Sequence, residues 1–134
     1  MTDERAASAG RILMVEDDAV TAHFMKHVLG RRGGFEVMHT PDPAIALECA
    51  RAQSWDLVLT DVELPGMTGL ELLHELRRAC PGVPVGVVTA HKATDATMAE
   101  LRDQADQFLE KPIQPDRLQA AVTALVAAGR TARA

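Results

Sequence analysis

Acidic side chains stand directly after two short apolar runs of this chain. Glu16 and Asp17 follow the run at 11–15, and Asp61 follows the run at 56–60. If these runs are neighbouring parallel strands, the three carboxylates meet, and like charges at close range raise one another's pKa. A hard divalent cation that prefers oxygen ligands, Mg²⁺ or Mn²⁺, resolves that repulsion. Because Mg²⁺ usually also takes a phosphate oxygen, the pattern favours a site for phosphoryl chemistry.

Two further polar side chains accompany the last two apolar runs. Thr89 ends the run at 83–88, and Lys111 follows the run at 107–110. A carboxylate can attack a phosphoryl donor as a nucleophile, and a lysine ammonium can neutralise a phosphate oxygen. Taken singly, such residues are commonly helix caps, turn formers or solvated loop residues. Their joint occurrence at four strand ends favours phosphoryl transfer to Asp61.

The elements that must position these residues alternate along the chain. The expected strands are 11–15, 35–39, 56–60, 83–88 and 107–110, and the expected helices are 20–31, 43–54, 70–80, 94–103 and 115–128. This alternation predicts parallel strands joined by right-handed crossovers. The fold class is therefore α/β, a (βα)5 doubly wound, flavodoxin-like parallel sheet with strand order 2-1-3-4-5. In such a sheet, ligands bind outside the carboxyl ends of the strands, where the polar residues stand.

Local signals set the limits of the first two helices. Val20, Phe24 and Val28 recur at a spacing of four and predict the apolar face of the first helix. Two arginines and two glycines at 31–34 predict its end. Asp42 is the expected N-cap of the second helix, because a proline follows it at the first helical position.

Length and composition indicate a single globular domain. We expect it to span 11–128, after a disordered lead-in at 1–10 and before a tail or linker stub at 129–134. The net charge of −5 gives no electrostatic reason to expect binding to nucleic acid or a membrane. Two isolated cysteines, Cys49 and Cys80, favour a reduced, cytoplasmic protein.

Four segments of the sequence resemble the receiver domain of two-component response regulators, including the single-domain chemotaxis type. The segments are Ile12-Leu-Met-Val-Glu-Asp-Asp18, the stretch from Asp56 to Gly69, Val85-Gly-Val-Val-Thr-Ala90 and Phe108-Leu-Glu-Lys-Pro-Ile113. Their order and spacing match that family over almost all of 11–127. The resemblance implies a phosphoprotein of phosphorelay signal transduction that stores its signal as an aspartyl phosphate.

The resemblance implies that Asp61 is the phosphoacceptor and that Mg²⁺, or Mn²⁺ in its place, is the cofactor. The implied metal ligands are Asp17, Asp61 and the backbone carbonyl of Glu63, with Glu16 acting nearby or through water. Gly66 would permit the turn beside the acceptor. The side chain of Glu63 adds an acid near the site, where we expect it to tune the lifetime of the phosphoryl group.

The resemblance also implies a conformational switch. Thr89 resembles the hydroxyl that contacts the phosphoryl group, Phe108 occupies the aromatic switch position, and Lys111 resembles the family's lysine. The bond from Lys111 to Pro112 is expected to be cis. Family members often have a tyrosine at the switch position, and a phenylalanine offers no hydroxyl to a partner. Gln104 stands where the family usually has a glycine, so either it takes a left-handed conformation at some cost or the loop differs.

Histidines add two weaker signals. His91 lies two residues after Thr89, at the expected rim of the site. A loop histidine without function is the favoured interpretation, and a role in setting the phosphoryl lifetime is the alternative. His23 and His27 have a helical spacing that can bind zinc. With no further ligand in the pattern, a solvated helix face is favoured for them.

The predicted function is that of a signalling phosphoacceptor, not an enzyme that turns over a substrate. A histidine kinase or histidine phosphotransfer protein would present a phosphohistidine to Asp61. Phosphorylation would then move Thr89 and Phe108 and bias a surface within 94–128. A downstream protein or output domain would read that surface, and we expect no direct binding to nucleic acid or membranes.

Two other functions remain open. A pseudo-receiver, which is an interaction module without phosphorylation, would share the fold but fail to bind Mg²⁺ or beryllofluoride. The complete set of acids, threonine and lysine argues against it. A Mg²⁺-dependent phosphatase with an aspartyl-phosphate intermediate would have a second acid two residues after the nucleophile, as Glu63 is. The sequence has no insertion to form a cap over a substrate, and turnover of phosphomonoesters would identify such an enzyme.

Overall fold

A sheet of five parallel strands forms the centre of the computed structural model, which describes residues 8–64, 66–92 and 94–133. In spatial order the strands are β2 (Glu36–Thr40), β1 (Arg11–Val15), β3 (Leu57–Thr60), β6 (Val85–Thr89) and β7 (Gln107–Glu110). This order confirms the predicted 2-1-3-4-5 arrangement, with β6 and β7 as the fourth and fifth strands. The expected fold class is therefore correct.

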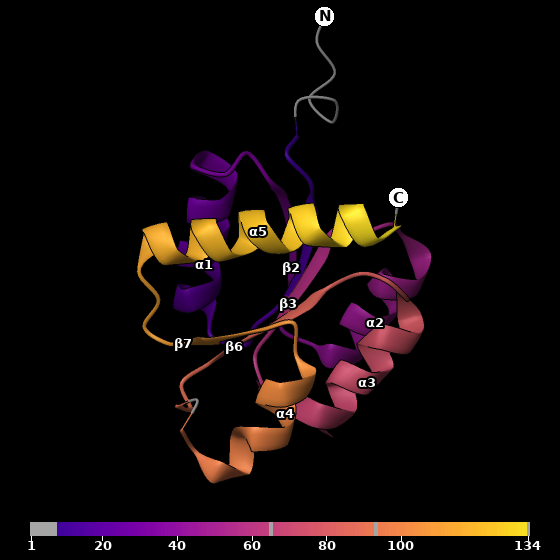
Figure 1. Ribbon diagram of the computed structural model, residues 1–134, viewed down its shortest axis with the longest axis vertical. Coiled ribbons are helices and arrows are strands. Elements are labelled where there is room, and N and C mark those ends of the chain that lie inside the picture. Colours follow the sequence, from indigo (N-terminus) through magenta and orange to yellow (C-terminus); the bar gives the residue numbers. More distant parts are fainter. Residues whose placement is uncertain (1–7, 65, 93, 134) are drawn as a thin grey trace, which may run out of the picture.

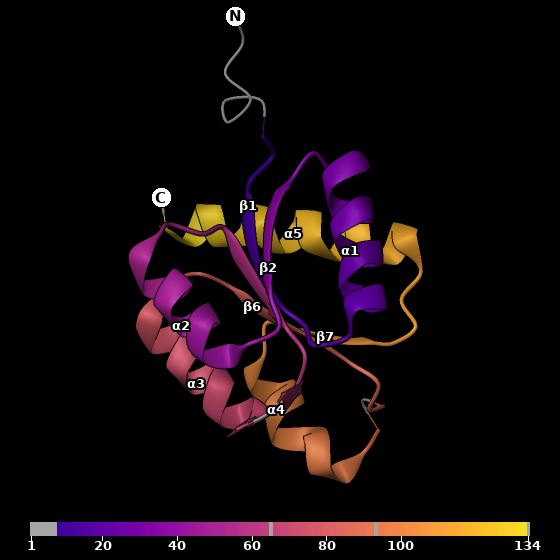
Figure 2. The ribbon, with the colours of Figure 1, turned by 180° about the vertical axis from the view of Figure 1, so that it is seen from behind.

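Helices cover both faces of the sheet (Figures 1 and 2). One face carries α1 (Ala19–Arg31) and α5 (Pro115–Arg133), and the other carries α2 (Pro43–Ala52) and α3 (Gly69–Ala79). A short helical segment, η1 (Ala96–Met98) followed by α4 (Ala99–Gln104), packs beside α3. None of the described helices combines the length and apolarity that crossing a bilayer requires.

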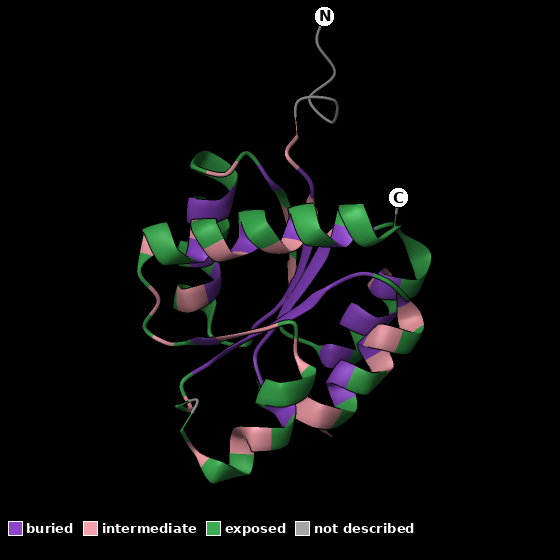
Figure 3. Ribbon diagram, viewed as in Figure 1, coloured by how far each residue is buried: buried purple, intermediate pink, exposed green. Residues whose placement is uncertain are grey.

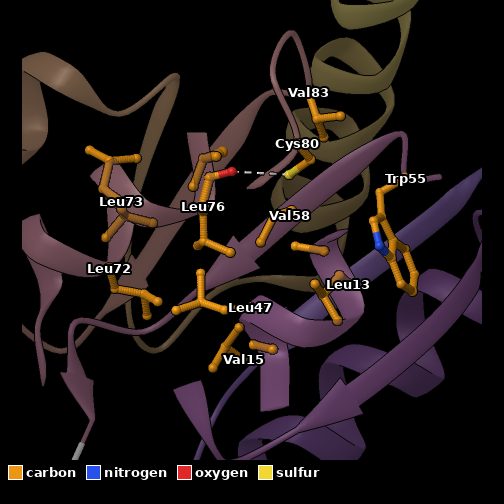
Figure 4. Packing of buried hydrophobic residues seen from close by; sticks show 14 of the residues in the cluster. Leu13, Val15, Leu47, Trp55, Val58, Leu72, Leu73, Leu76, Cys80 and Val83 are labelled. Atoms are coloured by element: carbon orange, nitrogen blue, oxygen red, sulfur yellow. Dashed lines mark hydrogen bonds between the residues drawn. The ribbon is translucent and has the colours of Figure 1, made fainter. Parts of the chain in front are cut away.

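Two hydrophobic cores lie between these layers, one on each face of the sheet. Side chains alternate along a strand, so Leu13 and Val15 of β1 enter the core under α2 and α3, while Ile12 and Met14 enter the core under α1 and α5. Figure 3 shows the resulting band of buried residues along the sheet. Figure 4 shows part of the first core, in which Val15 lies beside Leu47 and both cluster with Leu13, Leu76 and Trp55. Burial on both faces explains why the central strands read as continuous apolar runs.

Aspartate side chains cap the starts of α1 and α2. Asp18 caps α1 by accepting the Val20 N–H at 3.1 Å, and Asp42 caps α2 by accepting the Ala44 N–H at 2.8 Å. The predicted start of the second helix at Asp42 is thus confirmed. Each cap satisfies a backbone donor that the first helical turn leaves without a partner.

The predicted apolar face of α1 is wrong at two of its three residues. Val20 is 79% exposed and Phe24 is 37% exposed, while Ala22, Met25 and Leu29 are buried together with Val28. Residues four apart advance by more than a full turn, so a stripe with that spacing drifts around a helix of 3.6 residues per turn. The buried stripe combines spacings of three and four, as a helix on a sheet requires.

Described residues on both sides of the expected 11–128 unit are structured. Helix α5 continues to Arg133, beyond the predicted limit at 128, so the described part of the expected tail is helical. Of the expected disordered lead-in, 1–7 lies outside the described residues. Ala9 donates its N–H to the Gly34 carbonyl at 2.9 Å, and the Gly10 carbonyl accepts the Glu36 N–H at 2.9 Å. The segment at 8–10 is therefore held by backbone hydrogen bonds beside β2.

Two turns settle smaller expectations, one at the carboxyl edge of the sheet and one just before the start of β7. The hairpin of β4 (Glu63–Leu64) and β5 (Met67–Thr68) contains Gly66, whose φ of 85° lies in the left-handed region, as predicted. Its neighbour Pro65 lies outside the described residues. Gln104 ends α4 without a positive φ, and the chain continues through an extended Ala105. Of the two expectations for Gln104, the different loop is therefore correct.

Candidate functional site

Three carboxylates converge at the carboxyl ends of β1 and β3. The two strands are neighbours, with Val15 in register with Thr60, so Glu16, Asp17 and Asp61 follow them at the same edge. One carboxylate oxygen from each of the three lies within 4.8 Å of the other two. Glu16 and Asp61 are buried, and Asp17 is exposed. The acidic cluster that the sequence predicted is therefore present, and it opens to solvent on the Asp17 side.

Lys111 supplies a positive charge between the two buried acids. Its Nζ lies 2.6 Å from Glu16 Oε1 and 2.7 Å from Asp61 Oδ2. Burial lowers the pKa of Lys111, but the hydrogen bonds to Asp61 and Glu16 outweigh it, so the pKa lies above its usual value. Burial raises the pKa of Glu16, and its hydrogen bond with Lys111 offsets only part of that rise. The lysine stays an ammonium and tethers the two acids.

Backbone contacts position Lys111 and Asp61. The Lys111 N–H donates to the Thr89 carbonyl at 2.7 Å, and the Lys111–Pro112 bond is cis, as the resemblance implied. Asp61 Oδ1 accepts the N–H groups of Val62 at 2.6 Å and Glu63 at 3.2 Å. One oxygen of the carboxylate is thus fixed by backbone donors and the other by the lysine.

Glu16 is held by two neighbours in a similar way. Its Oε2 accepts the Asp18 N–H at 3.2 Å. The His39 ring Nε2 lies 2.7 Å from the Glu16 carbonyl oxygen and donates to it. His39 was not identified from the sequence. Its position near the end of β2, the strand next to β1, was the available signal. Both contacts fix the backbone from which Glu16 enters the site.

The two switch residues stand on adjacent strands. Thr89 ends β6 with its side chain fully buried, and its Oγ1 accepts the His91 N–H at 3.2 Å. Phe108 of β7 is half-buried and packs against the core under α2 and α3. Because β6 and β3 are neighbours, the structure brings Thr89 to the same edge as Asp61. Phe108 lies earlier in its strand than Thr89 does in β6, paired with Val87.

His91 bridges two acids at the rim of the site. Its Nε2 makes a short contact with Glu63 Oε1, and its Nδ1 lies 3.4 Å from Asp95 Oδ2. The hydrogen bond to Glu63 raises the pKa of His91, burial opposes that rise, and Asp95 adds to it. Sequence reasoning placed His91 at the rim but missed Asp95, whose spacing of four from His91 was the available signal. By contrast, the pair His23 and His27 lies exposed on α1.

The donor set of the acidic cluster fits a hard divalent cation. Three carboxylates meet, and the ammonium of Lys111 balances only part of their charge. Carboxylate oxygens are ligands that Mg²⁺ accepts readily, usually together with water, and exposed Asp17 leaves room for water. The residues present therefore suit Mg²⁺ better than a cation that prefers nitrogen or sulfur.

Comparison with known proteins identifies relatives of this chain. The family model of the response regulator receiver domain matches residues 12–123. A response regulator receiver protein of Anaeromyxobacter sp. strain Fw109-5 is 41% identical over 108 residues, which are 81% of this chain and 45% of the relative. The DNA-binding response regulator MtrA of Mycobacterium tuberculosis strain H37Rv is 40% identical over 114 residues, 85% of this chain and 49% of that protein. The chain thus spans about half the length of the curated relatives it matches.

Solved structures of receiver domains have the same fold as this chain. A CheY-like response regulator receiver domain protein from Methanospirillum hungatei JF-1 superposes with a TM-score of 0.81 at 27% identity, covering 92% of this chain and 98% of that one. The receiver domain of sensor histidine kinase PA1611 from Pseudomonas aeruginosa PAO1 superposes with a TM-score of 0.78 at 28% identity, covering 90% and 99%. The latter structure has a magnesium ion coordinated in its active site cleft.

Proposed function

Because this chain belongs to the family of response regulator receiver domains, we propose that Asp61 accepts a phosphoryl group from a phosphohistidine donor. The observation that carries the proposal is the contact of Lys111 Nζ with Asp61 Oδ2 and Glu16 Oε1. It places a cation beside a carboxylate that backbone N–H groups already orient. Phosphoryl transfer depends chiefly on such positioning and charge neutralisation.

The transfer makes one bond and breaks one. A carboxylate oxygen of Asp61 attacks phosphorus, and the bond between phosphorus and the donor's imidazole nitrogen breaks. The nitrogen keeps the electron pair and takes a proton from water. Lys111 remains charged throughout and faces the phosphoryl oxygens. The hydroxyl of Thr89 then leaves the His91 N–H and donates to a phosphoryl oxygen, while Phe108 fills the space that Thr89 leaves.

The metal would be held by residues of the acidic cluster. We assign Asp17, Asp61 and the backbone carbonyl of Glu63 as its ligands, with Glu16 acting indirectly. When bound, Mg²⁺, or Mn²⁺ in its place, would supply positive charge that offsets the charge of the phosphoryl group. Support comes from the three clustered carboxylate oxygens and from the magnesium in the related PA1611 receiver domain.

The partners and setting follow from this role. A histidine kinase or phosphotransfer protein donates the phosphoryl group, and a downstream protein or output domain reads the 94–128 face. The domain assists only its own phosphorylation and dephosphorylation, and it has no substrate to turn over. We assign it to the cytoplasm, because its two free cysteines suit a reducing compartment. We retain 11–128 as the extent of the receiver unit.

Labelling with radioactive acetyl phosphate tests the acceptor. We expect Mg²⁺-dependent incorporation into the wild type, in a form labile to base, and almost none in Asp61→Asn. Asp103→Asn, which changes an exposed acid, is the control and should be labelled like the wild type. Undiminished labelling of Asp61→Asn would remove Asp61 from its role. Absence of Mg²⁺ binding would favour a pseudo-receiver, and sustained turnover of phosphomonoesters would favour a phosphatase.

A further inference from the structure

Three side chains form a continuous polar chain across the rim of the site. His91 stands in the middle, with Glu63 on its Nε2 and Asp95 on its Nδ1. The three come from different places in the fold: the start of β4, the residues after β6, and the cap of η1. The chain therefore ties the loop that carries the acceptor to the segment that leads into α4.

Each member is also connected to the machinery of phosphorylation or to a helix start. The Glu63 N–H donates to Asp61 Oδ1 at 3.2 Å, and the His91 N–H donates to Thr89 Oγ1 at 3.2 Å. Asp95 Oδ1 accepts the N–H of Thr97 at 2.9 Å and its hydroxyl at 2.8 Å. Hydrogen bonds thus connect Thr89 to His91, His91 to Asp95, and Asp95 to the start of η1.

Few apolar side chains of the η1–α4 segment are buried. The described residues of η1 include none that is buried, and α4 buries Leu101 alone, whereas α3 buries Leu72, Leu73 and Leu76. A hollow of about 330 Å³ lies between α3 and the η1–α4 segment, and Glu63, His91, Leu70 and Met98 are among the residues that line it. Met98 also packs against the core. Because few apolar side chains of the η1–α4 segment are buried, polar contacts such as this chain contribute to its position.

We propose that Glu63, His91 and Asp95 form a latch that holds His91 and the cap of η1 in the conformation of this structure and opposes the switch. For Thr89 to turn towards a phosphoryl group, its hydroxyl must leave the His91 N–H. The backbone of His91 cannot move freely while both ring nitrogens are held by acids on two other elements. Breaking these contacts costs free energy, which binding of the phosphoryl group must offset. The latch therefore lowers the population of the switched conformation.

This inference rests on the proposed function of Asp61 and Thr89. Beryllofluoride with Mg²⁺ is a non-covalent stand-in for the phosphoryl group, so its affinity reports the cost of switching without involving hydrolysis. Removing the latch raises the populated fraction of the switched form, and the apparent dissociation constant falls in proportion. We expect His91→Ala to bind beryllofluoride about threefold to tenfold more tightly than the wild type.

Two variants and one control make the measurement specific. Glu63→Gln keeps an oxygen that can accept from His91 but loses the charge, so its affinity should lie between those of the wild type and His91→Ala. His27→Ala removes an exposed histidine of α1 and should leave the affinity unchanged. The affinity for Mg²⁺ alone should change by less than about twofold in His91→Ala and His27→Ala, since neither change removes a ligand assigned to the metal.

Amide hydrogen exchange without ligand gives a second, independent readout. The amides of Thr97 and Met98, which donate to Asp95, should exchange faster in His91→Ala than in the wild type. Unchanged or weaker beryllofluoride affinity in His91→Ala, or an equal gain in His27→Ala, would overturn the latch, as would unchanged exchange at these amides. If the wild type and Asp61→Asn respond alike to beryllofluoride, the proposed function fails instead, and the exchange result still decides the latch.

Discussion

At the scale of a single residue, Lys111 provides the positive charge that offsets the buried carboxylates of the site. Its side chain is 17% exposed and its ammonium lies within 2.7 Å of an oxygen on each of two buried acids. Removing one partner from such a cluster leaves the others with buried charge that nothing compensates. A bound divalent cation would compensate the same charge. Lys111 and a bound metal would therefore act on the same acids, and the two effects can be separated by substitution.

We expect Lys111→Met to unfold more easily in Mg²⁺-free buffer, by about 2–3 kcal/mol, because Glu16 and Asp61 lose their counter-charge. Mg²⁺ should bind the variant several-fold more tightly, since a competing positive charge is gone, and should recover part of the lost stability. Urea unfolding with and without Mg²⁺ measures both effects. Lys92→Met, at an exposed position, is the control. If wild type and Lys111→Met are equally stable without Mg²⁺, Lys111 does not stabilise the fold as a counter-charge.

At the scale of the element, the helix starts were more predictable than the helix faces. A cap is a local event, because Asp42 and the residue it bonds are two positions apart, and the sequence predicted it correctly. The face of α1 depends on contacts with distant parts of the chain. Asp116 at the start of α5 pairs with Arg32 at 2.6 Å, and Gln119 donates to the Arg32 carbonyl at 3.1 Å. These contacts join the end of α1 to α5, and the apolar residues of α1 alone could not reveal them.

The start of α3 offers a test at this scale. Thr68 Oγ1 accepts the Glu71 N–H at 3.2 Å and donates to Glu71 Oε1 at 2.9 Å. Thr68→Ala should therefore lower the free energy of unfolding by about 1 kcal/mol and the melting temperature by about 2–6 °C. Thr123→Ala, at an exposed position within α5, is the matched control and should be neutral or slightly stabilising. A melting temperature of Thr68→Ala equal to that of the control would show that this cap carries no weight.

At the scale of the whole molecule, Asp56 joins α5 to the end of the sheet that lies opposite the site. Its carboxylate accepts the Arg11 N–H at 2.8 Å and contacts Arg130 at 3.1 Å and Arg133 at 3.3 Å. The two arginines belong to the part of α5 that the sequence suggested was a tail. Acid–arginine pairs join positions far apart in the sequence, so only the folded chain shows that α5 must extend to meet Asp56.

These contacts predict a pH dependence of stability. Burial raises the pKa of Asp56, but the hydrogen bonds from Arg130 and the Arg11 N–H, with the two arginine charges, lower it below its ordinary value of 3.8. A carboxylate whose pKa is lower in the folded state stabilises the fold above its ordinary pKa, and that contribution disappears as the pH falls through the folded value. Asp56→Asn should thus be less stable than the wild type at pH 6, by about 1 kcal/mol because the arginines are partly exposed.

Unfolding in urea between pH 6 and pH 2.5 checks the sign. The difference between wild type and Asp56→Asn should be constant at neutral pH, begin to shrink near 3.8 and vanish below the folded pKa. Glu48→Gln, at an exposed position on α2, should show no such convergence. A difference that persists at the lowest pH, or grows there, would mean that the charge of Asp56 is not what stabilises this end.

The sequence by itself determined the sheet order, the edge that carries the site, and the acids, threonine and lysine gathered there. It could do so because strand alternation and the rule that parallel strands end at one edge need no knowledge of packing. Only the tertiary structure decided which face of α1 is buried, how far α5 runs, and that Glu63, His91 and Asp95 meet. Those features depend on contacts between different elements. The path of the whole chain determines which residues meet in such contacts, and no local sequence pattern reveals them.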